Sequence, residues 1–266
     1  MIHHQTIYRY SAPVTRSVQI LRLIPRSDLR QRVLEWELRL PAEASEYLDA
    51  YGNVTRLLTM EGRHDEIEIG VDGRVETSGN VTFPSPIDQR FPPEIFLTET
   101  PLTTANEPLK DFAEKHRDEI ASNPFAALQA LMERIRAAVR YVKGTTHVQS
   151  TAADVLSQGS GVCQDHSHLF IACCRALGVP ARYVSGYLYS DPDHHPEVAM
   201  HAWAEAWVDG MGWLSFDVSN GRPAGETHLR LAIGRDYMDA CPVRGVRFGG
   251  GNERMEVSVN VMTAQQ

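Results

Sequence analysis

The sequence predicts an α+β protein with an N-terminal β-sandwich-like module over residues 1–100 and an α+β module over residues 101–266. Three observations support this prediction. The first hundred residues alternate polar and apolar positions with a period of two, which is typical of half-buried strands. A proline-rich segment over residues 84–101 then interrupts this pattern. Beyond it, three segments with helical periodicity precede a helix that is apolar nearly all round and belongs in the middle of a domain.

The composition excludes several classes of protein. The 266 residues are 42% hydrophobic and 23% charged, which is ordinary for a globular protein with an ample core. The net charge is -8 and the arginines are scattered, so we expect no nucleic-acid partner. No apolar run approaches the roughly 20 residues of a membrane helix, and the first residues lack the apolar segment of a signal peptide. We therefore expect a cytoplasmic protein with no membrane partner, and four cysteines do not form a disulfide scaffold.

The β module should contain short strands joined by tight turns. The strands are expected over residues 7–14, 17–25, 33–41, 53–61, 65–73 and 73–79. The sequences AYGNV and VDGRV are predicted hairpin turns, because Gly and Asn tolerate positive φ. Six arginines fall in the first 32 residues, and we predict that they lie on the solvent face of strands rather than in a site for an anionic partner: Arg9, Arg16, Arg22, Arg26, Arg30 and Arg32.

Helix signals mark the second module. Helices should begin at Asn106, at Asn123 and at Thr151, where Thr151 and Asp154 have capping-box spacing. The apolar central helix should end at Gly178, because Pro180 prevents its continuation. Strands are then expected over residues 181–189, 201–208 and 213–218. Residues 228–241 are predicted to be helical or irregular, and residues 255–262 to form a final strand of this module.

Cys163 lies at the first turn of the central helix, behind a Gly-Ser-Gly sequence. Unpaired amides and the positive end of the helix dipole favour a thiolate there, and the glycines would let a substrate approach the backbone. The alternative interpretation is a small buried hydrophobic residue, which is what we expect for Cys173, Cys174 and Cys241.

A metal site at Cys163, His166 and His168 is not expected. Residues five apart on a helix point about 140° away from each other, so Cys163 and His168 do not share an ion. No Cys-x-x-Cys or His-Glu-x-x-His pattern is present, and we expect neither a metal nor a cofactor.

A thiol nucleophile needs a base, and the base needs a partner that orients it. His201 opens a predicted strand, and Asp217 ends the next one. Their side chains share a face only if paired residue numbers in this hairpin sum to an even value, as with a loop of three or five residues. Trp203, Trp207 and Trp213 would then shield the site. The alternatives are a strand-end histidine and a turn aspartate without catalytic roles.

Two stretches of this sequence resemble motifs of the transglutaminase-like superfamily. The pattern comprises GSGVCQDHSHLFIACCRALGVPARYVSGY and HAWAEAWVDGMGWLSFD, over roughly residues 125–220. The first hundred residues, with YRYSAPV, LRLIPR and DAYGN, resemble the N-terminal β region of bacterial members. The resemblance implies a papain-like core in which Cys163 is the nucleophile, His201 the base and acid, and Asp217 the residue that orients His201.

The resemblance leaves the reaction open, because the superfamily contains transglutaminases, peptidases and peptide-N-glycanases. Unlike animal transglutaminases, this chain has Val162 and Gln164 around the cysteine and no calcium-loop pattern. We therefore expect a bacterial cysteine peptidase or amidase that cleaves peptide or isopeptide bonds through a thioester. An acyl transferase that joins a glutamine acyl group to an amine, or a non-catalytic binding protein, are the alternatives.

The expected partner is a peptide or protein substrate, and a homo-oligomer remains open. The Cys163 amide should be one oxyanion donor, and Tyr141, Thr146 and Gln149 are candidates for the second. The N-terminal module could gate the cleft, bind substrate or mediate dimers.

Overall fold

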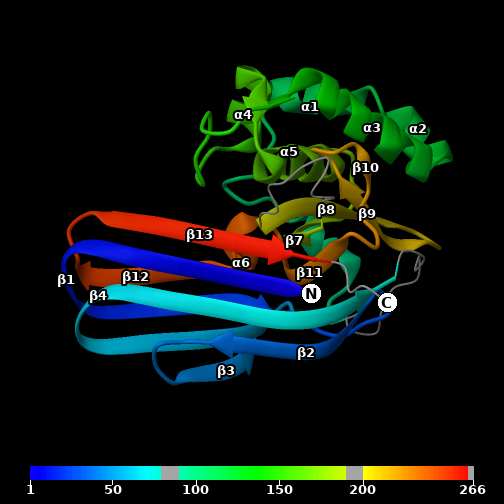
Figure 1. The fold of residues 1–266 in the computed structure, drawn as a ribbon. Helices are drawn as coiled ribbons and strands as arrows, with labels where there is room; N and C mark the ends of the chain where they lie inside the picture. Colours follow the sequence, from blue (N-terminus) through cyan, green and yellow to red (C-terminus); the bar gives the residue numbers. More distant parts are fainter. Residues whose placement is uncertain (79–89, 190–199, 263–266) are drawn as a thin grey trace.

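The computed structural model describes residues 1–78, 90–189 and 200–262, so part of the proline-rich segment lies outside the described residues. Two antiparallel sheets form the framework, and most helices lie on one side of the second sheet (Figure 1). The strands of the first sheet are β1 (Ile2–Ile24), β2 (Gln31–Arg39), β3 (Ala44–Leu48), β4 (Val54–Thr77), β12 (Val243–Gly249) and β13 (Glu253–Val261). The second sheet contains β7 (Ala181–Leu188), β8 (Met200–Val208), β9 (Gly212–Asp217), β10 (Arg222–Pro223) and β11 (His228–Gly234). The helices are α1 (Glu107–Glu114), α2 (Arg117–Ser122), α3 (Pro124–Ala138), α4 (Ala152–Gln158), α5 (Cys163–Ala176) and α6 (Tyr237–Ala240), with a 3-10 turn at Pro93–Leu97.

The first sheet is built on two unusually long strands. β1 and β4 pair along most of their length, with shifts in register between Arg9 and Val14 and between Val14 and Arg16. Figure 1 shows both strands running to the end of the sheet that is distant from the helices, bending there and returning. The sheet thus folds over itself around buried side chains such as Val14, Leu21 and Ile67. The predicted sandwich-like module is confirmed.

Three predicted strand boundaries within this module are wrong. Residues 7–14 and 17–25 form one strand, and residues 53–79 contribute a single strand up to Thr77. The AYGNV turn is present, with Gly52 at φ +82°. The VDGRV sequence lies inside β4, and a Cβ at Gly73 would come within 2.2 Å of the Trp36 ring. Gly73 is therefore needed for close packing rather than for a turn.

The C-terminal strands lie in the first sheet, which differs from the predicted division at residue 100. β13 pairs with residues 2–10 of β1, and β12 pairs with residues 14–21. They cover the edge of β1 that β4 leaves unpaired, and exposed edges are unfavourable because their backbone groups lack partners. Residues 101–266 therefore supply the helices and the second sheet, and they also complete the N-terminal module.

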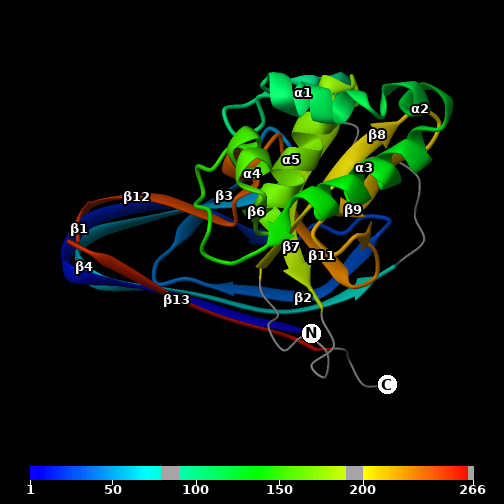
Figure 2. The ribbon, with the colours of Figure 1, turned by 90° about the horizontal axis from the view of Figure 1, so that it is seen from above.

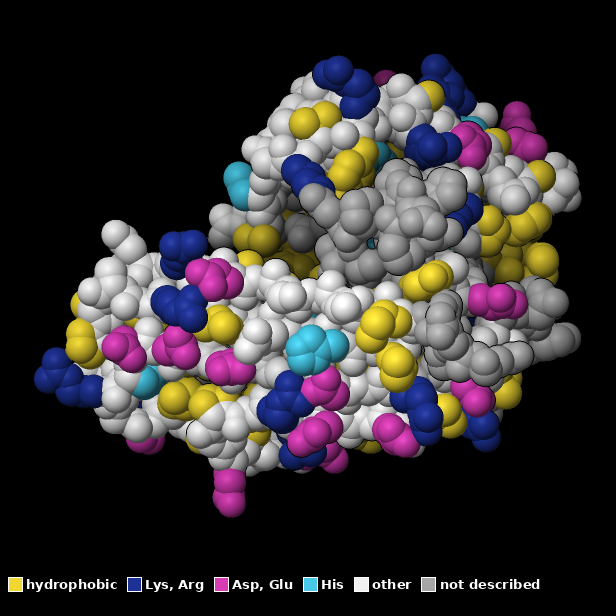
Figure 3. All heavy atoms as spheres, in the orientation of Figure 1, with side chains coloured by type: hydrophobic (Ala, Val, Ile, Leu, Met, Phe, Trp, Pro, Cys, Tyr) yellow, Lys and Arg dark blue, Asp and Glu magenta, His cyan; other side chains and the backbone are white. Residues whose placement is uncertain are grey.

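The surface of the first sheet carries charges of both signs. Figure 3 shows positive and negative side chains interspersed on this face. Arg9 pairs with Glu66 at 2.9 Å and Arg32 with Glu76 at 2.7 Å, both at exposed positions. The predicted solvent location is confirmed for these arginines.

Arg30 differs, because it reaches the second sheet. Its Nη1 donates to Glu205 at 2.7 Å, and its Nη2 donates to the Trp213 carbonyl at 2.5 Å. Gln31 and Arg230 also connect the two sheets, since the Gln31 side chain bonds both the amide and the carbonyl of Arg230. Arg30 therefore joins the N-terminal module to the second sheet.

The second sheet has the order β10-β9-β8-β7-β11 and packs against α5. In Figure 2 α1, α3 and α4 lie around α5. The predicted caps are confirmed: Asn106, Asn123 and Thr151 each accept an amide hydrogen bond, and Gly178 adopts φ +79° after α5. Among the described residues, no helix is long and apolar enough to span a membrane.

The prediction for residues 228–241 was wrong in part, because residues 228–234 form β11. Leu229 and Leu231 face the core of the first sheet, whereas Ala232 faces the core around α5. A strand that is buried on both faces shows a continuous apolar run instead of alternation, and such a run does not distinguish a strand from a helix.

Candidate active site

Cys163 begins α5 and is partly exposed, as expected for a reactive side chain. Asp165 fixes this end of the helix, because its Oδ2 accepts the Val162 amide and the Thr146 hydroxyl, each at 2.7 Å. The amides of the first turn remain directed outward.

The two glycines before Cys163 have local structural roles. Gly159 ends α4 at φ +69°, and a Cβ at Gly161 would lie 2.7 Å from the Asp165 Cβ. Our interpretation that they give a substrate access to the backbone is therefore not needed to explain them.

The β8–β9 hairpin brings His201 and Asp217 to the same face. Val208 pairs with Gly212, so residue numbers sum to 420 and the loop has the odd length required. His201 Nε2 lies 3.0 Å from Asp217 Oδ1 as an ion-pair contact that is not aligned as a hydrogen bond. The Cys163 thiol adjoins the same ring and contributes to its pKa. The structure thus brings all three predicted residues together.

Both members of the His201–Asp217 pair favour their charged forms. Burial by itself lowers the pKa of His201, but Asp217 and Cys163 outweigh it and raise this pKa to about 10. Burial would likewise raise the pKa of Asp217, but the contacts of its carboxylate with His201, His228 and Asn220 hold that pKa far below its usual range. The site therefore stabilises an imidazolium between a carboxylate and the sulfur.

The His201 pKa predicts a dependence of stability on pH. A histidine whose pKa is raised by folding contributes stability that is complete below its unfolded value of 6.5 and is lost as the pH rises towards about 10. We expect the free energy of unfolding to decrease over this interval, and to decrease less in His201→Gln. Denaturant titrations across the interval, with the NMR titration of His201, measure both quantities. A midpoint near 6.5 for His201 in the folded protein contradicts the prediction.

Sequence reasoning missed His228 as a neighbour of Asp217. Its Nε2 lies 2.9 Å from Asp217 Oδ2. Asn220 Nδ2 donates to the same oxygen at 2.7 Å, and the Ser219 hydroxyl donates to Oδ1 at 3.1 Å. No pattern in the sequence indicates the His228 contact, because β9 and β11 are not neighbours in the sheet.

Of the three predicted shielding tryptophans, only Trp203 contacts these histidines. Its ring centroid lies 6.3 Å from that of His201 and 5.2 Å from that of His228. Gly186 leaves room for the indole, since a Cβ there would lie 2.7 Å from it. Trp207 and Trp213 instead contact each other, at 5.6 Å between centroids.

The candidates for the second oxyanion donor are not equally placed. Tyr141 lies near the sulfur: burial raises its pKa to about 12, with a further contribution from Cys163. Thr146 donates its hydroxyl to Asp165, and the structure places Gln149 in a separate surface pocket beside α6. Tyr141 therefore remains the candidate.

Both ring nitrogens of His166 and Nε2 of His168 are engaged elsewhere, whereas the buried Nδ1 of His168 has no hydrogen-bond partner among the described residues. His166 faces the carbonyls of Val162 and Val139, each at 2.9 Å, and His168 Nε2 accepts the Tyr237 amide. Among the described residues, His201, Asp217 and His228 are the one set whose ligand atoms lie within 4.8 Å of one another. His228 does not suit a metal, because its Nδ1 accepts the Gly225 amide at 3.2 Å and its proton is therefore on Nε2.

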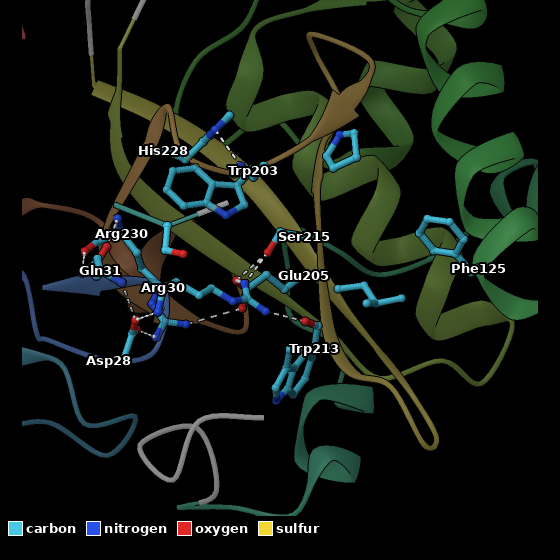
Figure 4. A pocket seen from close by; sticks show the side chains of 15 residues that line it. Asp28, Arg30, Gln31, Phe125, Trp203, Glu205, Trp213, Ser215, His228 and Arg230 are labelled. Atoms are coloured by element: carbon cyan, nitrogen blue, oxygen red, sulfur yellow. Dashed lines mark hydrogen bonds and ion pairs between the residues drawn. The ribbon is translucent and has the colours of Figure 1, made fainter. Parts of the chain in front are cut away.

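A pocket of about 460 Å³ adjoins the site on the side of His228 and Trp203 (Figure 4). Its floor contains the buried Glu205, whose carboxylate accepts hydrogen bonds from Arg182 at 2.5 Å and from Arg30 at 2.7 Å. These hydrogen bonds anchor Glu205 between the two sheets.

A cysteine at a helix start, in contact with a histidine–aspartate pair on a packed antiparallel sheet, defines a protein of papain-like architecture. Residues 114–218 match the transglutaminase-like superfamily, and residues 1–76 match the bacterial transglutaminase-like N-terminal region. The chain belongs to the transglutaminase-like superfamily.

The chain is similar to individual proteins over different shares of its length. An uncharacterized protein of Mycobacterium leprae is 33% identical over 270 residues, which cover 97% of this chain and 96% of that protein. A protein-glutamine gamma-glutamyltransferase of Pseudomonas aeruginosa is 30% identical over 101 residues, which cover 34% of this chain and 15% of that protein. The crystal structure of a protein from Cytophaga hutchinsonii described as a putative cysteine protease has a TM-score of 0.78 and 25% identity, covering all of this chain and 91% of its own.

Proposed function

We propose that this protein is a thiol enzyme that cleaves amide bonds in peptide or protein substrates. The observation that carries the proposal is the convergence of three side chains: Cys163 adjoins the His201 ring, and His201 lies 3.0 Å from the buried Asp217. The likeness to the Cytophaga hutchinsonii structure supports the same class of reaction. The free thiols of all four cysteines are consistent with a reducing compartment such as the cytoplasm.

The proposed reaction proceeds through a thioester. The Cys163 sulfur attacks the amide carbon, and the Cys163 amide, with Tyr141 as second donor, stabilises the oxyanion. The imidazolium of His201 gives its proton to the leaving amine as the carbon–nitrogen bond breaks. A water molecule that His201 deprotonates then attacks the thioester, which releases the acid and the thiol.

Acyl transfer is the second candidate, and the match to the protein-glutamine gamma-glutamyltransferase favours it. The two reactions share every step up to the thioester, and they differ in whether water or an amine resolves it. A peptide and isopeptide library, with Cys163→Ala as the control, identifies the acyl group from the mass of the trapped enzyme. Addition of a primary amine then distinguishes amide exchange from hydrolysis. No mass increase on any substrate contradicts both candidates.

We expect iodoacetamide to label Cys163 faster than Cys173 or Cys174 at pH 6. Cys163 is partly exposed beside the His201 imidazolium, whereas burial raises the pKa of Cys173 and of Cys174 well above the usual range. Mass spectrometry of the labelled peptides measures the rates. Equal labelling of the three cysteines contradicts an activated thiol at Cys163.

A further inference from the structure

Asp217 lies between two imidazoles, one at each carboxylate oxygen. His201 Nε2 is 3.0 Å from Oδ1, and His228 Nε2 is 2.9 Å from Oδ2. The side chain of His228 is 2% exposed and that of Asp217 is fully buried. The proposed reaction uses one of these histidines directly and leaves the other without a role.

The surroundings of His228 determine where its proton lies. The Gly225 amide donates to Nδ1 at 3.2 Å, and an amide N–H only donates, so Nδ1 carries no proton. The Nε2–H therefore donates to Asp217 Oδ2. Burial lowers the pKa of His228 despite the nearby Asp217 carboxylate, and His201 and Arg222, the other charged groups facing the ring, lower it further. The ring is a neutral donor near pH 7.

We propose that His228 is a positioning residue that holds the Asp217 carboxylate so that Oδ1 is directed at His201. The inference rests on the proposed function, because the orientation of His201 matters for reactivity only if Cys163 reacts. Trp203 contacts both rings, at 6.3 and 5.2 Å, and so fixes their separation. Figure 4 shows His228 and Trp203 side by side at one wall of the pocket, away from the charged floor.

Three substitutions of His228 distinguish the roles of its two ring nitrogens. His228→Gln places an amide nitrogen near the Nε2 position, His228→Asn provides a polar group near the Nδ1 position alone, and His228→Leu provides neither. In the His228→Gln variant, we expect the rate of Cys163 alkylation at pH 7 to stay within about threefold of the wild-type rate. In the His228→Asn and His228→Leu variants, the alkylation rate should decrease about tenfold or more. This is the factor expected when one hydrogen bond to a buried charge is lost.

The pH profile provides a readout that a purely structural role does not change. In Asn and Leu, Asp217 loses a donor that holds its pKa below its usual range, so the acid limb of the alkylation rate should move to higher pH. The melting temperatures of the three His228 variants show how much of any change comes from altered packing, because each substitution replaces the imidazole ring with a side chain of another shape. Equal alkylation rates in Gln, Asn and Leu overturn the proposal.

The tautomer is measured without activity. Long-range ¹H–¹⁵N NMR spectra of the wild-type protein should show His228 protonated at Nε2, and protonation at Nδ1 overturns the proposal. Failure of the proposed function looks different: wild-type Cys163 labels no faster than Cys173 while the His228 tautomer remains as inferred. That result removes the reaction that His228 would serve, and it overturns the inference as well.

Discussion

Replacement of Cys163 by alanine is expected to abolish turnover of the true substrate, by at least about a thousandfold, because no other group can form the thioester. The fold should be retained, since Cys163 is partly exposed and its removal leaves no enclosed cavity. Turnover is measured on the substrate found in the library screen, with circular dichroism and thermal unfolding to confirm that the protein is folded.

Cys241→Ala is the matched control for this substitution. It removes another free thiol, which is buried at the end of α6 and lies outside the proposed site. We expect this variant to be somewhat less stable but to keep its turnover number. Full activity in Cys163→Ala contradicts the assignment of the nucleophile, whatever the result for Cys241.

Substitution of Glu205 by glutamine should cause the largest loss of stability. The Glu205 side chain is 1% exposed, and Arg182, which is fully buried, donates to it at 2.7 and 2.5 Å. Arg30 and the Ser215 hydroxyl also donate to it, and Arg230 lies 3.7 Å from it as a further ion-pair partner. Removing one partner of a buried ion pair leaves an uncompensated charge and costs about 3–5 kcal/mol. The melting temperature should decrease by roughly 10 °C.

The exposed pair Glu114–Arg117 is the control for this effect. Glu114→Gln removes a carboxylate that lies 2.5 Å from Arg117 at a surface where both side chains are at least half exposed. The change in the free energy of unfolding should be below about 0.5 kcal/mol, as for other surface pairs. Similar losses in the two variants would show that burial does not determine the contribution of Glu205.

The Glu205 network also explains how the two sheets are joined. Arg182 lies over the Trp213 ring at 4.1 Å and donates to Glu205 Oε2, whereas Arg30 from the N-terminal module donates to Glu205 Oε1. An arginine of the first module therefore neutralises a carboxylate of the second. Loss of Glu205 should for this reason loosen the contact between the modules as well as the core.

Much of the candidate site could be predicted from the sequence, because its signals are local. Cys163 follows a helix stop and a glycine-rich turn, and the helix that it opens is apolar nearly all round. His201 and Asp217 share a face only if paired residue numbers in their hairpin sum to an even value, and the three-residue loop meets this condition. Such features depend on residues within a few positions of each other along the chain.

The sequence by itself determined the helix caps and the buried central helix, and it indicated the three residues that lie together in the site. Only the tertiary structure decided the partners that lie far apart along the chain. The return of β12 and β13 to β1, the contact of Arg30 with Glu205 and the second histidine at Asp217 all belong to this group. A contact between distant segments is fixed by how the sheets bend and pack in three dimensions, and residue periodicity carries no record of it.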